Sequence, residues 1–203
     1  MTITYEYEGA LYVNLTNRCN CNCEFCLRHG KAEGSIYTED SLWLEREPTR
    51  EEILASIESR DLSAYQQLVF CGFGEPVYRL EEICWVIDRL KEKGKKIFTR
   101  MDTNGTGCLI HGRDICPEFA GRFDKLSISL NTDTAEKYEA LCHPVHPGSY
   151  EAMKAFAKEV RRYVPEVMMT VVDTISTEEI ENCRRICEEE IGAVYRVREY
   201  IAD

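Results

Sequence analysis

The chain has 203 residues and is acidic, with 25 lysines and arginines against 36 aspartates and glutamates, a net charge of −11 and a pI near 5.0. This charge, without any basic run, disfavours broad binding to bare nucleic acid. We see neither a signal peptide at the start nor an apolar run long enough to cross a membrane. Eleven cysteines in such a chain predict free thiols and a cytoplasmic location.

Strand-like and helix-like segments alternate along the whole chain, and we find no repeat or linker. We therefore expect residues 1–203 to form a single domain with one core. Apolar, β-favouring runs predict six strands, at 11–15, 67–71, 97–101, 125–130, 167–172 and 194–200. Helical spacing and capping residues predict helices at about 49–59, 80–93, 149–163 and 176–192, with another beginning at Asp133.

Six strands joined by helical crossovers predict an α/β fold with a parallel sheet and helices outside. In residues 125–131 the aliphatic side chains share one face, and the polar side chains of Ser127, Ser129 and Asn131 share the other. A closed eight-stranded barrel fills its interior with aliphatic side chains, so a polar inner face favours an open one. We predict a partial (βα)6 barrel with parallel strands and a polar concave side. Two-faced antiparallel sheets also alternate, so this prediction depends on the intervening helices.

The loop after the first predicted strand contains Cys19, Cys23 and Cys26 in a C-x3-C-x2-C pattern. Three thiolates in one loop can hold three irons of a four-iron cluster and leave the fourth iron open to a ligand. The residues alone leave two alternatives open. One is a zinc site completed by Cys21 or His29, and the other is an iron–sulfur site completed by a distant cysteine.

With Phe25 directly before its last cysteine, this pattern resembles the motif of the radical S-adenosylmethionine (radical SAM) enzymes. The resemblance implies a [4Fe-4S] cluster on the three cysteines, with S-adenosylmethionine (SAM) bound to the open iron and the Phe25 region beside it. It implies reductive cleavage of SAM to a 5′-deoxyadenosyl radical, which abstracts hydrogen from a substrate. An external one-electron reductant of the flavodoxin or ferredoxin type is implied as well.

The segment after the second strand resembles the Gly-Gly-Glu-Pro element of that family, although here it reads Gly72-Phe73-Gly74-Glu75-Pro76. The resemblance implies that Gly72, Phe73, Gly74 and Glu75 contact SAM, with the carboxylate near its amino group. Glycine also allows a bare backbone to approach a ligand closely. The alternative is a simple glycine turn.

The third strand ends in Asp-Thr-Asn-Gly, which resembles members of the activating-enzyme type and implies a SAM or substrate role for Asp102 and Asn104. Asn-Gly is also a common turn, and that alternative competes evenly. Ser129 and Asn131 resemble the family's ribose-binding element. In the last strand, Arg196 or Arg198 is implied to pair with the SAM carboxylate or an anionic substrate, against the alternative of a surface arginine.

The remaining cysteines favour structural roles. Cys183 and Cys187 lie four residues apart in an apolar helical stripe, which predicts buried thiols. Cys108, Cys116 and Cys142 fall in loops near the expected active end. They are candidates for an auxiliary cluster but lack the close grouping that such clusters use. His111, Arg113 and Asp114 follow the third strand and are candidates to face a substrate.

We predict a radical SAM enzyme of unassigned substrate. Residues 42–48, 112–121 and 127–131 resemble the short radical SAM proteins linked to TatD-family hydrolases, which implies such a hydrolase as a genomic or physical neighbour. An insertion at about 27–48, with Tyr37 and Trp43, is apolar enough for a lid or a dimer contact. The alternatives are an enzyme like the glycyl-radical activases or 7-carboxy-7-deazaguanine synthase, and a non-catalytic iron–sulfur or zinc protein.

Overall fold

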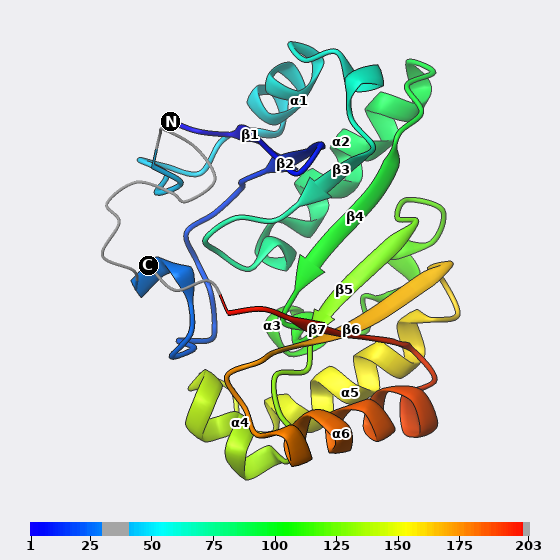
Figure 1. Ribbon diagram of the computed structural model, residues 1–203. Helices are drawn as coiled ribbons and strands as arrows, with labels where there is room; N and C mark the ends of the chain where they lie inside the picture. Colours follow the sequence, from blue (N-terminus) through cyan, green and yellow to red (C-terminus); the bar gives the residue numbers. More distant parts are fainter. Residues whose placement is uncertain (30–40, 201–203) are drawn as a thin grey trace.

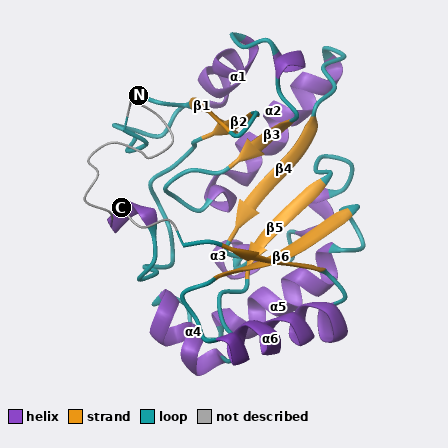
Figure 2. Cartoon of the chain, viewed as in Figure 1, coloured by secondary structure: helices purple, strands orange, loops and turns teal. Residues whose placement is uncertain are grey.

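The computed structural model describes residues 1–29 and 41–200, and its centre is one curved sheet with helices on the outer face (Figures 1 and 2). The strands within these residues are β1 (Thr4–Tyr7), β2 (Ala10–Val13), β3 (Gln67–Phe70), β4 (Phe98–Thr103), β5 (Lys125–Ser129), β6 (Glu166–Val172) and β7 (Val194–Arg198). They lie side by side in chain order, and β2 to β7 are parallel. The predicted α/β fold with a parallel partial barrel is confirmed.

Strand β1 was not predicted, and it pairs antiparallel with β2 at the edge of the sheet. The two strands are joined by Glu8 and Gly9, which both have positive φ angles of 46° and 74°. A two-residue turn of this kind matches the twist of a hairpin. Tyr5 lies opposite Tyr12, and their rings stack at 5.1 Å, so the hairpin extends the parallel sheet by one strand.

The predicted helices are present with small shifts at their ends, and α3 is a further helix that was not predicted. They are α1 (Arg50–Glu58), α2 (Leu80–Glu92), α3 (Gly107–His111), α4 (Ala135–Cys142), α5 (Ser149–Val160) and α6 (Thr177–Arg185). Short 3-10 turns are η1 (Leu27–His29), η2 (Leu62–Ala64), η3 (Pro76–Arg79) and η4 (Cys116–Phe119), and η5 (Ile186–Ile191) is a π-helical continuation of α6. Capping boxes at Thr49 and Ser176 start α1 and α6 as predicted. Among the described residues, no helix is both long and apolar enough to cross a membrane.

The core fills the space between the sheet and the helices. Because the strands follow one another in chain order, successive crossovers of the same hand place their helices on the same side. Alternate strand residues face this layer and are fully buried, as in Leu68, Met101 and Leu126. Cys183 and Cys187 are buried in the same core, which confirms the structural role predicted for them.

The opposite, concave face of the sheet is polar, as the alternation in the sequence predicted. Arg100 and Asp102 on β4 form an ion pair of 2.8 Å, and Lys125 on β5 pairs with Glu166 on β6 at 2.6 Å. Ser127 lies beside Asp102 in register and is half-buried. The sheet therefore separates an apolar core from a polar concave surface.

Candidate functional site

The loop that carries the three predicted cluster ligands begins at the carboxyl end of β2. Cys19, Cys23 and Cys26 are half-buried in it, and the Cys26 N–H donates to the Cys23 carbonyl at 3.1 Å in a turn that leads into η1. The pKa of each thiol is raised, for Cys19 by its contact with the Cys21 thiol, for Cys23 by its contact with Cys142, and for Cys26 by burial. The thiols of Cys19 and Cys23 both contact that of Cys21, and Cys26 lies in the turn that follows.

This donor set fits an iron–sulfur cluster. Thiolate is the ligand that such clusters use, and the protein needs to supply only three thiolates if a small molecule occupies the fourth iron. Two further cysteines adjoin the three: Cys21, and Cys142 at the end of α4. Sequence spacing gave no reason to place Cys142 there, because 116 residues separate it from Cys26.

Backbone hydrogen bonds attach the cysteine loop to the end of α4. The Asn22 N–H donates to the Cys142 carbonyl at 2.9 Å, and the Glu24 N–H donates to the Leu141 carbonyl at 3.0 Å. Together they hold the middle of the loop against the C-terminal end of α4. Main-chain contacts thus position the segment between Cys19 and Cys26.

A second attachment comes from the Asp-Thr-Asn-Gly segment at the end of β4. Asn104 Nδ2 donates to Asn20 Oδ1 at 2.7 Å, and Asn20 Nδ2 donates to Thr106 Oγ1 at 2.8 Å. Asn104 Oδ1 in turn accepts from the Thr106 N–H and hydroxyl. The side chain of Asn104 is fully used by these contacts, so in this structure it positions the cysteine loop; the predicted contact with SAM or substrate stays a prediction.

Glu75 lies at the centre of this arrangement and is 4% exposed. Its carboxylate accepts from Thr103 Oγ1 at 2.6 Å, from the Asn104 N–H at 2.7 Å and from the Val77 N–H at 3.2 Å. Burial raises its pKa to about 7 although these donors favour the charged form. The carboxylate therefore connects β3 to the end of β4, and its predicted contact with the SAM amino group stays a prediction.

The two glycines beside Glu75 are required by the protein's own packing. A Cβ atom on Gly74 would lie 2.3 Å from the Thr16 carbonyl oxygen, and one on Gly72 would lie 2.1 Å from Asn14 Oδ1. The Glu75 N–H also donates to the Arg18 carbonyl at 2.8 Å. The backbone at these glycines was predicted to approach a ligand closely. In this structure it lies closely against the start of the cysteine loop. Their predicted contact with SAM is a separate matter and stays a prediction.

Phe73 is half-buried and meets the described part of the insertion. Its ring packs edge-on against Trp43 at 5.1 Å, and the Arg28 guanidinium lies 5.3 Å above the Trp43 ring. Asn14 Nδ2 donates to the Leu42 carbonyl at 2.7 Å, which fixes this part of the insertion to the end of β2. Residues 30–40 of the predicted lid, Tyr37 included, lie outside the described residues.

The predicted ribose element lies at the carboxyl end of β5. The Asn131 N–H donates to the Thr170 carbonyl at 3.2 Å in a left-handed conformation with φ of 67°, which turns the chain away from the strand. Asn131 Nδ2 donates to Cys142 Sγ at 3.2 Å, but Asn131 Oδ1 is buried without a partner among the described residues. Because a buried acceptor normally has a donor, this atom and the half-buried Ser129 fit a hydroxyl-bearing ligand.

The other predicted residues come from three separate parts of the chain. Asp102 is engaged by Arg100, which also donates to the Tyr12 hydroxyl at 3.1 Å. Arg198 is exposed at the end of β7, in register with Val172. Phe25 is partly buried against the core.

The three residues considered as substrate contacts after β4 have other neighbours. His111 Nε2 lies 2.9 Å from the Val77 carbonyl oxygen, and Arg113 pairs with Glu118. Asp114 Oδ1 accepts from the Cys116 N–H at 2.9 Å. All three belong to the α3–η4 segment, which packs against α5 in the outer helical layer.

A half-barrel with three cysteines in one loop at its carboxyl edge and a polar concave face has the donors that an iron–sulfur cluster takes. The radical SAM superfamily model matches residues 13–187. The chain belongs to the radical SAM superfamily, which is a superfamily of enzymes.

The chain is similar to curated relatives that carry the name GTP 3′,8-cyclase. The protein of Corynebacterium glutamicum is 35% identical over 137 residues, which cover 64% of this chain and 33% of the relative. The one from Pyrococcus horikoshii, named probable GTP 3′,8-cyclase, is 27% identical over 190 residues, which cover 93% of this chain and 55% of the relative. The chain thus spans about a third to about half of these relatives.

Solved structures show the same fold. Streptococcus suis SuiB bound to precursor peptide SuiA superposes with a TM-score of 0.69 at 17% identity, over 96% of this chain and 40% of SuiB. Methylornithine synthase (PylB) superposes with a TM-score of 0.58 at 12% identity, over 95% of this chain and 53% of that one. At such identities the likeness concerns the fold alone.

Proposed function

We propose that this protein is a radical SAM enzyme whose substrate is unassigned, and that Cys19, Cys23 and Cys26 hold a [4Fe-4S] cluster. The observation that carries the proposal is that Cys19, Cys23 and Cys26 share one loop at the carboxyl end of β2, fixed by main-chain hydrogen bonds to α4. When bound and reduced, the cluster would supply the electron that cleaves SAM to a 5′-deoxyadenosyl radical. Reduction would come from an external one-electron donor of the flavodoxin or ferredoxin type.

The chain's own residues would bind and orient SAM on the concave face. The segment from Gly72 to Glu75 lies against the start of the cysteine loop and would receive the methionine end of SAM. Ser129 and Asn131 would receive the ribose, because Asn131 Oδ1 is a buried acceptor without a donor among the described residues. Arg198, exposed at the end of β7, would pair with an anionic group. The aromatic pair of Trp43 and Phe73 would limit water access beside this site.

Anoxic reconstitution with iron, sulfide and SAM tests the proposal. The full chain is expected to convert SAM to 5′-deoxyadenosine under a strong reductant, measured by liquid chromatography, and Cys26→Ala should lose both the cluster absorbance and this activity. Cys84→Ala, at a half-buried thiol on α2, is the matched control and should retain both. Sustained SAM cleavage by Cys26→Ala contradicts the proposal. A cluster without SAM cleavage in the unmodified chain favours the non-catalytic alternative.

A narrower placement with the short TatD-linked radical SAM proteins is supported by the sequence resemblance at 42–48, 112–121 and 127–131. This placement implies a TatD-type hydrolase as a genomic or physical neighbour. Co-purification of such a hydrolase with this protein from native cells tests the physical association. Enzymes like the glycyl-radical activases or 7-carboxy-7-deazaguanine synthase share the same first step, and product analysis with candidate substrates separates them. A cytoplasmic location is part of the proposal, because no disulfide joins any two of the eleven cysteines.

A further inference from the structure

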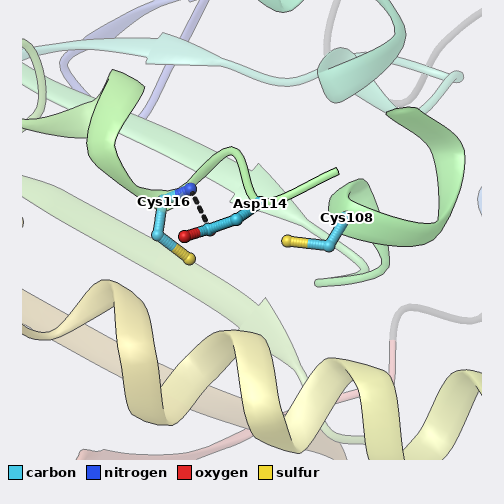
Figure 3. Close-up of side chains that lie close together, drawn as sticks. All are labelled: Cys108, Asp114 and Cys116. Carbon is cyan, nitrogen blue, oxygen red and sulfur yellow. Dashed lines mark hydrogen bonds between the residues drawn. The ribbon is translucent and has the colours of Figure 1, made fainter. Parts of the chain in front are cut away.

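A second group of metal-binding side chains lies outside the site described above, in the connection between β4 and β5. Cys108 on α3, Cys116 on η4 and Asp114 between them bring two sulfurs and a carboxylate oxygen within 4.8 Å of one another. Figure 3 shows the two thiols and the carboxylate converging from the two sides of the turn. We refer to these three residues as the Cys108 group.

The local backbone explains why residues eight positions apart meet. Gly112 ends α3 with a positive φ of 64°, which reverses the chain, and the Arg113 N–H then donates to the Cys108 carbonyl at 3.2 Å. Asp114 Oδ1 accepts from the Cys116 N–H at 2.9 Å, which fixes the carboxylate beside the start of η4. The geometry of the group is therefore set by main-chain contacts.

The charges around the group leave room for a cation. Arg113, the nearest basic residue in the sequence, is paired with Glu118. Within residues 1–29 and 41–200, Asp114 forms no ion pair with a lysine or arginine side chain. His111 and Arg113 lie near the Cys108 thiol, but in the described part of the chain the Asp114 carboxylate has no basic side chain paired with it.

We propose that the Cys108 group binds one divalent zinc-class metal ion through Cys108 Sγ, Cys116 Sγ and an Asp114 carboxylate oxygen. Zinc accepts thiolate and carboxylate ligands in a tetrahedral arrangement with Zn–S bonds of about 2.3 Å, which places two sulfur ligands about 3.8 Å apart. The present spacing requires a contraction of at most about 1 Å. Binding converts two thiols to thiolates and releases their two protons.

Water would complete the coordination, because Asp114 is exposed whereas Cys116 is buried. An iron–sulfur cluster fits less well here, since it normally takes four protein thiolates and the described residues offer only two at this place. The metal would fix α3 against η4. Because Cys108 lies two residues after Thr106, which holds Asn20 of the cysteine loop, the metal would also steady that loop.

Metal analysis of the cluster-loaded full chain, purified anoxically from zinc-supplied cells, tests this proposal. Mass spectrometry of the elements should find about one zinc per chain, and Cys108→Ser/Cys116→Ser should lose at least about nine-tenths of it while keeping its iron. Cys84→Ser is the matched control, because its thiol contacts the Glu118 carbonyl of η4 without belonging to the group, and it should keep its zinc. Zinc that remains in the double variant, or is absent from the unmodified chain, overturns the proposal.

X-ray absorption at the zinc edge of the unmodified protein gives a test that needs no variant to fold. The expected first shell has about two sulfurs near 2.3 Å and about two oxygens near 2.0–2.2 Å. A shell of three or four sulfurs would place the zinc on the Cys19 loop instead and overturn the proposal. Peptide mapping that finds a Cys108–Cys116 disulfide in place of the metal would overturn it as well.

Discussion

Asn104 Nδ2 donates a hydrogen bond to Asn20 Oδ1 at 2.7 Å, across a separation of 84 residues. Asn104 directly follows strand β4, whereas Asn20 lies between the first two cysteines that we propose as cluster ligands. The Thr106 hydroxyl oxygen also accepts from Asn20 Nδ2, and the Glu75 carboxylate accepts from the Asn104 N–H. This polar group ties the cysteine loop to the sheet, so the order of the ligand loop depends on side chains distant in the sequence.

Removing this contact should loosen the cysteine loop. Asn20→Ala and Asn104→Ala should each lower the free energy of unfolding by about 1–2 kcal/mol, because each leaves buried partners without a hydrogen bond. The double variant should show a coupling energy of about 1 kcal/mol. Denaturant titration of the cluster-free chain measures both. The control is Asn182→Ala, which removes a hydrogen bond to Asp133 and should show no coupling energy with Asn104→Ala. If the losses of unfolding free energy in Asn20→Ala and Asn104→Ala are strictly additive, the account is contradicted.

Gly74 should tolerate no side chain. In Gly74→Ala the new methyl group meets the Thr16 and Arg18 carbonyl oxygens at 2.3 and 2.7 Å, and both are backbone atoms that cannot rotate away. We expect a loss at or above the upper end of the about 1–3 kcal/mol typical of overpacking, with poor cluster incorporation. Gly121→Ala is the control, because nothing lies within 4 Å and only its positive φ costs about 1–2 kcal/mol. Thermal unfolding measures both variants. Equal losses of stability in Gly74→Ala and Gly121→Ala would contradict the packing described here.

The buried carboxyl of Glu75 should make stability fall as pH rises. Its pKa is about 7 in the folded chain and near 4.5 ordinarily, so between these values the folded state keeps a proton that the unfolded state has lost. The free energy of unfolding then decreases with pH, by up to about 3 kcal/mol in all, and no further above pH 7.

Denaturation of the cluster-free chain from about pH 5 to about pH 8 measures this effect. Glu75→Gln is neutral throughout and should be less stable overall, because its amide nitrogen cannot accept from the Asn104 N–H. Its stability should nevertheless decline less with pH than that of the unmodified chain. Glu136→Gln, at an exposed position, should leave the pH dependence as it is. If the free energy of unfolding falls equally with pH in Glu75→Gln and in the unmodified chain, the account is contradicted.

Trp43 should report the arrival of SAM, because its ring packs against Phe73 in the segment that we propose to contact SAM. In Trp85→Phe, Trp43 is the one remaining tryptophan of the chain, and its emission should change when SAM is added to the cluster-loaded protein. In Trp43→Phe the remaining Trp85 lies on α2 with Arg50 above it and should not respond. A response confined to Trp85 would place SAM elsewhere.

Most of the fold was predicted from the periodic spacing of apolar residues in the sequence. The alternation in residues 125–131 identified both faces of β5, and the capping residues at Thr49 and Ser176 located two helix starts. Strand β1 was missed because Glu8-Gly9 lacks the Asn-Gly or Asp-Gly pair that marks a two-residue hairpin turn. The turn is visible only in the φ angles that the folded chain adopts.

The cysteine motif located the thiol group, but its supports could not be predicted. Cys142 and Asn20 join that group through tertiary contacts that no spacing encodes. The glycines of residues 72–75 suggested a close approach to a ligand, whereas their missing Cβ atoms make room for Asn14 and Thr16. Likewise, Cys108 and Cys116 looked isolated because their meeting depends on the chain reversal at Gly112.

The central claim is that three thiolates leave one iron open and that SAM binds to it. Electron–nuclear double resonance on the reduced, cluster-loaded chain tests this most directly, with SAM carrying ¹⁵N in its amino group or ¹⁷O in its carboxylate. The account predicts hyperfine coupling from both labels, and its loss in Cys26→Ala together with the cluster. Spectra unchanged by the labels, in a protein whose cluster is intact, would contradict it.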